Sequence, residues 1–192
     1  MAHDSHFTKT FGITDTAVVL IDHQQGTCGW VYSIDSELLQ KNVGILATFA
    51  TKLKMPLVLT SSMFVIHGFR LLLDVIQKAA PEAYENRIKR QGIVNAWDDP
   101  NFAHAVRQTG KSHLIVAGVT TDVCLVPPAL SMQKEGFHIK VGDEAANGKC
   151  VLDAGGSPTD RVEQIALERL KQAGVPVTST NAVVTELIKH CI

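Results

Sequence analysis

The sequence predicts an α/β protein in three layers, in which a mostly parallel sheet of six strands lies between two layers of helices. Strand-sized apolar runs alternate along the chain with segments of helical periodicity. Three of these runs are apolar almost throughout, as strands are when helices cover both faces of a sheet. The length of 192 residues suits one hydrophobic core, so we expect a single domain over residues 1–192.

Six segments are expected to form the strands. Five of them are short apolar runs, and another, third in chain order, lies inside the polar segment NRIKRQGIVNAW. Pro176 cannot donate a hydrogen bond to a neighbouring strand, so the last strand is expected at an edge of the sheet. In chain order, strands are predicted at Thr16–Ile21, at 57–60, within 86–97, and at 114–119, 137–141 and 175–178.

Helices are expected between these strands. The first begins at about Ser36, where Asp35 or Ser36 itself can cap it, and carries one apolar stripe. Another begins near Asp99, a further one follows Pro158, and the last begins near Thr180. The glycine-rich segment 147–157 is predicted to be a loop.

Charge and composition narrow the classes of partner. The net charge of −1 does not provide the positive field of a nucleic-acid-binding protein. The apolar runs are far shorter than the roughly 20 residues that cross a bilayer. The first ten residues lack the apolar core of a secretory signal, and the four cysteines form no CxxC pair, which suits reduced thiols. We therefore expect a cytoplasmic protein whose partner is a small-molecule substrate, with no nucleic acid or membrane partner.

Asp22 is the first candidate for chemistry. It follows directly on the apolar run AVVLI, and ligands of open α/β sheets bind beyond the carboxyl ends of the strands. A partly desolvated carboxylate in that place can act as a base, although a role in supporting a turn is the alternative.

Cys124 is the second candidate. In LIVAGVTTDVC the chain leaves its most apolar strand and reaches Cys124 where a helix is expected to begin. The positive end of the helix dipole and a nearby cation would lower the pKa of this thiol, whereas a buried structural cysteine is the alternative. Pro127 and Pro128 cannot donate intrahelical hydrogen bonds, so the turn with Cys124 is expected to be separate from the following helix.

Lys89 and Arg90 supply candidate cations in the short third strand. Adjacent residues of a strand face opposite sides of the sheet, so only one of the two is expected to enter the site.

Three motifs together resemble the isochorismatase-like superfamily of cysteine hydrolases, and most of all its YcaC-like branch. They are IDHQQG, RQGIVNAWDD and AGVTTDVCLVPPALSMQKEGF, and the likeness runs over residues 16–177. Asp22, Arg90 or Lys89, and Cys124 match the aspartate, cation and cysteine of the superfamily in order. In the YcaC-like branch the cation aligns with Arg90, so we prefer Arg90 and keep Lys89 as the alternative.

The resemblance implies a strand order of 3-2-1-4-5-6, in which the ends of the first and fourth strands meet where the order reverses. It also implies a cis peptide bond between Val119 and Thr120, and an oxyanion hole formed by the backbone amides of Thr120 and Cys124. Trp97 is equally compatible with a core position. The candidates to line the substrate pocket are Gln24, Phe64, Asn95, Trp97 and Thr121.

The implied mechanism is hydrolysis through a thioacyl enzyme. Asp22 takes the proton of Cys124, the sulfur attacks an acyl carbon, and water cleaves the thioacyl enzyme. Isochorismate cleavage does not need the cysteine, so Cys124 favours small amide-like or related acyl substrates. No cofactor is expected, and the relatives imply a homo-oligomer.

The sequence offers three other interpretations. Nicotinamidase-like relatives bind a metal through an aspartate and paired histidines after the second strand, but only His67 lies there, so no metal is expected. Cys124 could instead serve as a redox sensor, although no resolving cysteine is identifiable. A non-catalytic oligomeric binding protein is the third interpretation, because segment 150–156 looks inserted relative to the YcaC-like pattern.

Overall fold

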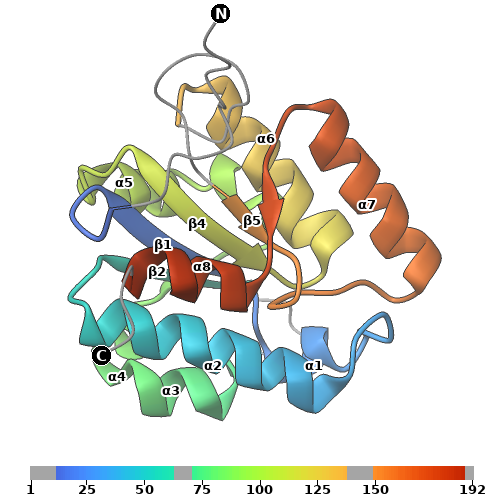
Figure 1. Cartoon of the computed structure of the whole chain (residues 1–192), viewed down its shortest axis with the longest axis horizontal. Helices are drawn as coiled ribbons and strands as arrows, with labels where there is room; N and C mark the ends of the chain where they lie inside the picture. The colour runs from blue at the N-terminus through green and yellow to red at the C-terminus, as the bar shows by residue number, and fades with distance from the viewer. Residues whose placement is uncertain (1–11, 63–70, 138–148, 189–192) are drawn as a thin grey trace, which may run out of the picture.

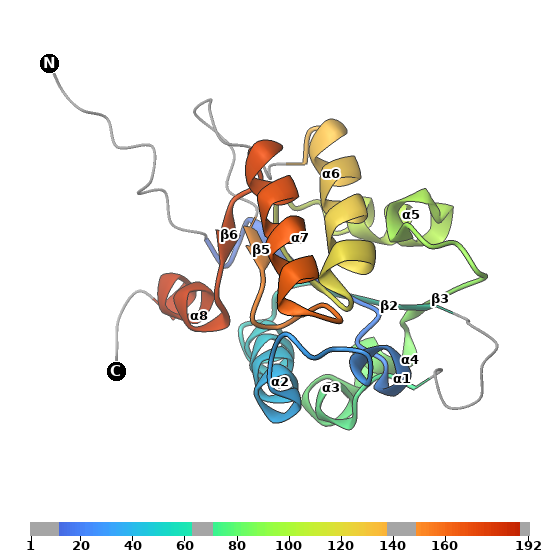
Figure 2. The same ribbon diagram turned by 90° about the vertical axis from the view of Figure 1, so that its right-hand side faces the viewer.

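The computed structural model describes residues 12–62, 71–137 and 149–188, and it confirms the three-layer α/β class. One sheet of six parallel strands has the order β3-β2-β1-β4-β5-β6, as the resemblance implies. Helices cover both of its faces (Figures 1 and 2). The strands are β1 (Thr16–Ile21), β2 (Leu57–Ser62), β3 (Ile88–Arg90), β4 (His113–Gly118), β5 (Lys149–Val151) and β6 (Val177–Thr178).

Two apolar cores lie on opposite faces of the sheet because side chains of a strand alternate. Val18 and Leu20 of β1 face one core, which α2, α3 and α8 cover; Ala17 and Val19 face the other, which α5, α6 and α7 cover. Figure 2 shows the two helical layers edge on. The helical elements are α1 (Gln25–Cys28), α2 (Ser36–Lys52), α3 (Asp74–Ala79), α4 (Pro81–Glu85), η1 (Ala96–Asp98), α5 (Pro100–Gln108), η2 (Thr121–Leu125), α6 (Val126–Lys134), α7 (Asp160–Gln172) and α8 (Thr180–Ile188).

The predicted helix starts are confirmed. Asp35 caps α2 by accepting a hydrogen bond from the Leu38 amide at 2.9 Å, and Asp99 caps α5 in the same way. The last helix begins at Thr180. The turn that carries Cys124 is a separate π-helical turn, η2, which runs directly into α6 with proline in the first turn of that helix. None of the helices in the described ranges is long and apolar enough to cross a membrane.

The fifth strand differs from the prediction. Most of the segment 137–141 lies outside the described residues, and Phe137 itself follows α6 without joining a strand. The described strand is instead β5, inside the segment that was expected to be a loop. Cys150 and Val151 are fully buried between β4 and β6, whereas the glycines that suggested a loop, Gly155 and Gly156, follow the strand. The last strand is at the edge, as expected, but only two residues long.

Candidate active site

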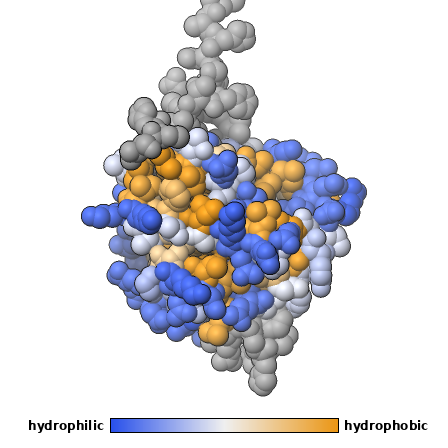
Figure 3. Space-filling model, turned by 60° about the horizontal axis from the view of Figure 1, so that its bottom comes forward, coloured by the Kyte–Doolittle hydropathy of each residue, from blue (hydrophilic) through white to orange (hydrophobic). Residues whose placement is uncertain are grey.

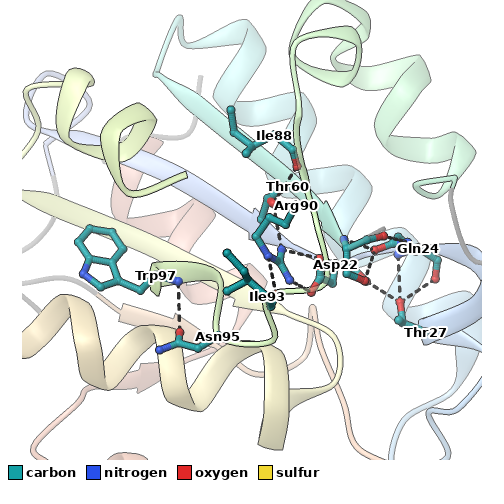
Figure 4. Close-up of polar contacts among 10 residues, drawn as sticks. Asp22, Gln24, Thr27, Thr60, Ile88, Arg90, Ile93, Asn95 and Trp97 are labelled. Carbon is teal, nitrogen blue, oxygen red and sulfur yellow. Dashed lines mark hydrogen bonds and ion pairs between the residues drawn. The ribbon is translucent and has the colours of Figure 1, made fainter. Parts of the chain in front are cut away.

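Asp22 and Arg90 form a buried ion pair at the carboxyl edge of the sheet (Figure 4). Asp22 directly follows β1, and Arg90 is the last residue of β3, with β2 between the two strands. Nη1 and Nη2 of Arg90 donate to Oδ1 and Oδ2 of Asp22 at 2.8 and 2.7 Å. Two parallel hydrogen bonds of this kind fix the carboxylate in one orientation.

Two further donors of Arg90 bind its surroundings. Its Nη1 also donates to Thr60 Oγ1 at 2.9 Å, and its Nε donates to the carbonyl oxygen of Ile93 at 3.2 Å. Arg90 is fully buried, whereas the neighbouring Lys89 is exposed. Of the two candidate cations, the structure therefore brings Arg90 and not Lys89 to Asp22, as the alternation of side chains along a strand requires.

The backbone of Asp22 has a conformation that is unusual for a residue with a side chain. Its φ is 59°, in the left-handed region, and such strain is found mostly at functional sites. Two hydrogen bonds hold the strained residue. The Asp22 amide donates to the carbonyl oxygen of Thr60 at 3.1 Å, and the Thr27 hydroxyl donates to the carbonyl oxygen of Asp22. The turn thereby points the carboxylate at Arg90.

Cys124 lies beside this pair because β1 and β4 are neighbours in the sheet. Ile21 is opposite Gly118, so the residues that follow the two strands meet where the strand order reverses. The peptide bond between Val119 and Thr120 is cis, as the resemblance implies. Cys124 itself is partly buried in η2.

A glycine is needed next to the cysteine turn. A Cβ atom on Gly118 would lie 2.9 Å from the carbonyl oxygen of Cys124 and 3.0 Å from its carbonyl carbon. Both are backbone atoms, which cannot swing aside as a flexible side chain can. Gly118 therefore permits the close approach of β4 and the turn that carries the thiol.

The electrostatics of the Cys124 thiol differ from the expectation. Burial raises the pKa of this thiol most. The charge of Asp22 and a hydrogen bond between the thiol and Asp22 raise the pKa further, whereas the charge of Arg90 and a hydrogen bond with the backbone of Thr120 lower it. The expected lowering fails because Asp22 already neutralises the cation, and because burial disfavours a thiolate. The resting thiol is thus protonated, and it lies next to the Asp22 carboxylate.

The expected oxyanion donors lie in the same turn. The Cys124 amide donates to the carbonyl oxygen of Thr120 at 2.7 Å. It would serve a developing oxyanion only as a donor shared between two acceptors, an arrangement that is common at helix ends.

The expected pocket residues are dispersed. Trp97 packs in the core edge-on against Phe102 and Phe137, and its indole donates to Glu135 at 2.7 Å, so it is not a wall of the site. This position suits the indole because a buried ring needs a partner for its N–H group. Asn95 caps η1 by accepting a hydrogen bond from the Trp97 amide at 3.2 Å (Figure 4), and its side-chain amide donates to Ser131.

The other expected pocket residues have structural contacts or lie outside the described residues. Gln24 is buried and binds the backbone of Ser62 with both ends of its amide, at 3.1 and 2.8 Å. Thr121 is buried and donates to Glu163 of α7. Phe64 lies outside the described residues.

Three residues near the site were not expected. Thr60 holds Arg90, and Thr27 holds the turn at Asp22. His23 is fully buried, and its Nε2 lies 2.7 Å from the carbonyl oxygen of Ala154. Burial lowers the pKa of His23 to about 4, with the Ala154 hydrogen bond and the Asp22 charge opposing. The signal for Thr60 was present, since it is the first polar residue of an apolar strand that adjoins Asp22.

Metal-ligating side chains do not gather in residues 12–62, 71–137 and 149–188. No group of three or more His, Cys, Asp or Glu side chains there could hold a metal ion. His67 lies outside these ranges.

Comparisons with known proteins agree with the fold. Residues 16–182 match the isochorismatase domain family. Probable hydrolase YcaC of Escherichia coli is 36% identical over 173 residues, which cover 90% of this chain and 77% of the relative. YcaC from Pseudomonas aeruginosa, solved with hexane-2,5-diol and covalent acrylamide, has a TM-score of 0.85 at 33% identity and covers 97% of this chain and 86% of its own.

The solved YcaC gene product of Escherichia coli, an octameric hydrolase of unknown specificity, gives a TM-score of 0.84 at 34% identity over 94% of this chain and 83% of its own. Family match, sequence identity and structural similarity all cover most of the chain. The chain belongs to the isochorismatase family and is a hydrolase.

Proposed function

We propose that this chain is a cysteine hydrolase that cleaves the C–N bond of a small amide-like substrate, or a related acyl bond, through a thioacyl enzyme. One observation carries the proposal. A buried, bidentate Asp22–Arg90 pair lies against the thiol of Cys124, at the reversal point of the sheet where α/β proteins bind ligands. A nucleophile, a base and a fixed cation are the parts that acyl transfer requires.

Proton transfer follows from this arrangement. Asp22 accepts the proton of Cys124 as the sulfur attacks the acyl carbon, and the negative charge that forms on the acyl oxygen is stabilised by the backbone amides of Thr120 and Cys124. When the C–N bond breaks, the leaving nitrogen takes the proton from Asp22. Water then attacks the thioester carbon with Asp22 again accepting a proton, which returns to the sulfur as the acid leaves.

Arg90 balances the charge throughout this sequence. Before transfer the negative charge is on Asp22, and after transfer it is on the sulfur or the acyl oxygen, so a single negative charge faces the guanidinium group in either state. Arginine does not exchange protons near neutral pH. Arg90 therefore acts by position and charge, and Thr60 helps to keep its fork aligned.

The Pseudomonas aeruginosa relative supports a nucleophile in this family. Its structure holds covalent acrylamide, and acrylamide is an electrophile with which thiols react. At 33% identity over nearly the whole of this chain, the same reactivity is proposed for Cys124.

A redox-sensing role is less well supported. Sensor cysteines have a low thiol pKa and often lie next to a resolving cysteine. The pKa of Cys124 is raised, and Cys28 and Cys150 are both buried with pKa values raised to about 12 by burial.

The proposal is tested by release of ammonia or amine from a panel of small aliphatic and aromatic amides. We expect activity in the wild type and in Cys28→Ala, and loss of at least about 10³-fold in Cys124→Ala. Cys28 is the matched control because it is another free cysteine, and it is buried. Turnover that survives Cys124→Ala would contradict the cysteine mechanism.

We also infer a homo-oligomer. The YcaC gene product of Escherichia coli is an octamer. Exposed apolar side chains follow the carboxyl ends of four strands here, and Figure 3 shows hydrophobic patches between hydrophilic residues on the lower face of the molecule. Light scattering after gel filtration should give a mass several times 20.8 kDa, whereas a monomer mass would contradict the inference. The exposed apolar side chains that follow the carboxyl ends of β1 to β4 are Trp30, Tyr32, Leu71, Val94 and Val123.

A further inference from the structure

The imidazole ring of His23 connects the ends of two strands that are not neighbours. His23 comes directly after Asp22, which ends β1, and its Nε2 lies 2.7 Å from the carbonyl oxygen of Ala154, which follows β5. In the sheet, β4 lies between β1 and β5. The ring therefore reaches across the end of β4, the strand that leads to Cys124.

The surroundings of the ring define where its proton is. A carbonyl oxygen only accepts hydrogen bonds, so Nε2 carries a proton and donates it to Ala154. The residue is fully buried, and its Nδ1 has no hydrogen-bond partner among the described residues. A second proton, on Nδ1, would place a positive charge in this buried position with no acceptor for that N–H group. His23 is thus a neutral donor, which suits a residue that holds other groups in place.

The segment that His23 binds also binds the turn with the cysteine. The carbonyl oxygen of Gly156 accepts a hydrogen bond at 2.8 Å from the amide of Thr121, the first residue of η2. Between Ala154 and Gly156 the chain passes close behind β4, since a Cβ atom on Gly155 would lie 2.6 Å from the carbonyl oxygen of Gly118. Residues 154–156 are therefore packed against the end of β4, with His23 bound at one end and Thr121 at the other.

We propose that His23 is a positioning residue: through residues 154–156, its ring sets where the turn at Asp22 lies relative to the turn that carries Cys124. The connection runs from Asp22 along the chain to His23, then from the ring to Ala154, and from Gly156 to the start of η2. His23 acts through the two turns and takes no proton itself. Its effect on turnover rests on the proposed function, whereas the connection between the two turns does not.

Two substitutions of His23 separate the hydrogen bond from the volume of the ring. His23→Phe fills a similar space and leaves the Ala154 carbonyl without its donor. His23→Gln keeps an N–H group at the end of the side chain that can donate to the same oxygen.

Asn42→Leu is the matched control for loss of a buried hydrogen bond. Asn42 of α2 is buried, and its Nδ2 donates to the carbonyl oxygen of Asp153 at 2.7 Å. The control therefore removes a bond of the same length to the residue that precedes Ala154, and it leaves the turn at Asp22 untouched.

The first measurement uses NMR and needs no activity. The nitrogen shifts of the ring should show the proton of His23 on Nε2. Solvent exchange of the Thr121 amide should be about tenfold faster or more in His23→Phe, and should return towards the wild-type rate in His23→Gln. A ring proton on Nδ1, an unchanged exchange rate in His23→Phe, or the same acceleration in Asn42→Leu would overturn the connection. Thermal melts show that each variant folds, and His23→Leu replaces His23→Phe if the larger ring is not accommodated.

The second measurement is a double-mutant cycle on the rate at which iodoacetamide labels Cys124. The charge of Asp22 raises the pKa of this thiol, so the rate in Asp22→Asn divided by the rate in its parent reports how strongly the two groups interact. We expect this ratio to fall about threefold or more in the His23→Phe background, because the two turns are no longer held at one separation. The ratio should be restored in His23→Gln and unaffected in Asn42→Leu. The same ratio in His23→Phe as in the wild type would overturn the positioning role.

Turnover distinguishes failure of this inference from failure of the proposed function. With an amide from the panel, His23→Phe should lower kcat about tenfold or more with KM little changed, because small misplacements of reacting groups are costly. Wild-type kcat in His23→Phe would overturn the role of His23 in catalysis. If the wild type cleaves no amide, the proposed function fails, while the exchange and labelling rates still decide on the connection between the two turns.

Discussion

The guanidinium group of Arg90 reaches across β2 to bind both carboxylate oxygens of Asp22, at 2.8 and 2.7 Å, with each partner buried. Three strand ends are thereby tied together, because the same guanidinium also donates to Thr60 on the strand between. The pair fixes the proposed base before any substrate arrives, and it sets the charge that the Cys124 thiol experiences.

Loss of one partner of this pair should destabilise the protein strongly. Arg90→Met leaves the Asp22 carboxylate buried without its cation, which typically costs about 3–5 kcal/mol in the free energy of unfolding. Urea denaturation measures the change. Lys89→Met is the matched control, and we expect less than about 0.5 kcal/mol because Lys89 is exposed. Equal losses in the two variants would contradict the assignment of Arg90 as the site cation.

Asp22→Asn should affect alkylation and hydrolysis in opposite directions. The charge of Asp22 raises the pKa of the Cys124 thiol, so removing it lowers that pKa and speeds iodoacetamide labelling at neutral pH. The same change removes the proposed base, so amide turnover should fall by about 10²–10⁴-fold. If labelling and turnover fall together, Asp22 serves the site by structure alone.

Stability should fall in mild acid because of His23. Its folded pKa is about 4 against an ordinary value of 6.5, so the unfolded chain binds the proton first as pH falls. The contribution of neutral, buried His23 to stability is complete above about pH 6.5 and is lost as the pH falls towards 4. Between pH 7.5 and pH 5 the free energy of unfolding should therefore fall by about 2 kcal/mol. Urea midpoints measure this slope, and His23→Gln should flatten it. An unchanged slope in His23→Gln would assign the acid sensitivity to other groups.

Gly118→Ala should disturb the site more than the same substitution of a glycine within a helix. Its Cβ would meet the backbone of Cys124 at 2.9 Å, so we expect a loss of about 1–3 kcal/mol and slower labelling of Cys124. Gly44→Ala is the control: its Cβ would meet Val75 at an ordinary 3.4 Å, and alanine suits the interior of α2. That variant should be neutral or stabilised. A stable Gly118→Ala with normal labelling would show that the turn has room to move.

The sequence was informative where local pattern and tertiary structure agree. The apolar run of β1 ends at Asp22 and that of β4 leads to Cys124, so strand periodicity alone located both residues at one edge of the sheet. The alternation of side chains also required that only one of Lys89 and Arg90 face the site, while the resemblance indicated which one.

Tertiary contacts decided what the sequence could not. Trp97 follows the cation in the chain and looked suited to a pocket wall, but its indole finds Glu135, 38 positions away, and packs in the core. The pKa of Cys124 depends on burial and on how far Asp22 neutralises Arg90, neither of which a helix start reveals. The three-residue β5 is too short for periodicity to separate it from the glycine-rich segment that follows.

The most direct test of the cysteine mechanism is peptide mass spectrometry of the enzyme after rapid acid quenching during turnover of an amide from the panel. We predict an acyl group on the peptide that contains Cys124 in the wild type, and no such group in Cys124→Ala. Turnover without an acyl group on Cys124, together with full activity in Cys124→Ala, would contradict it.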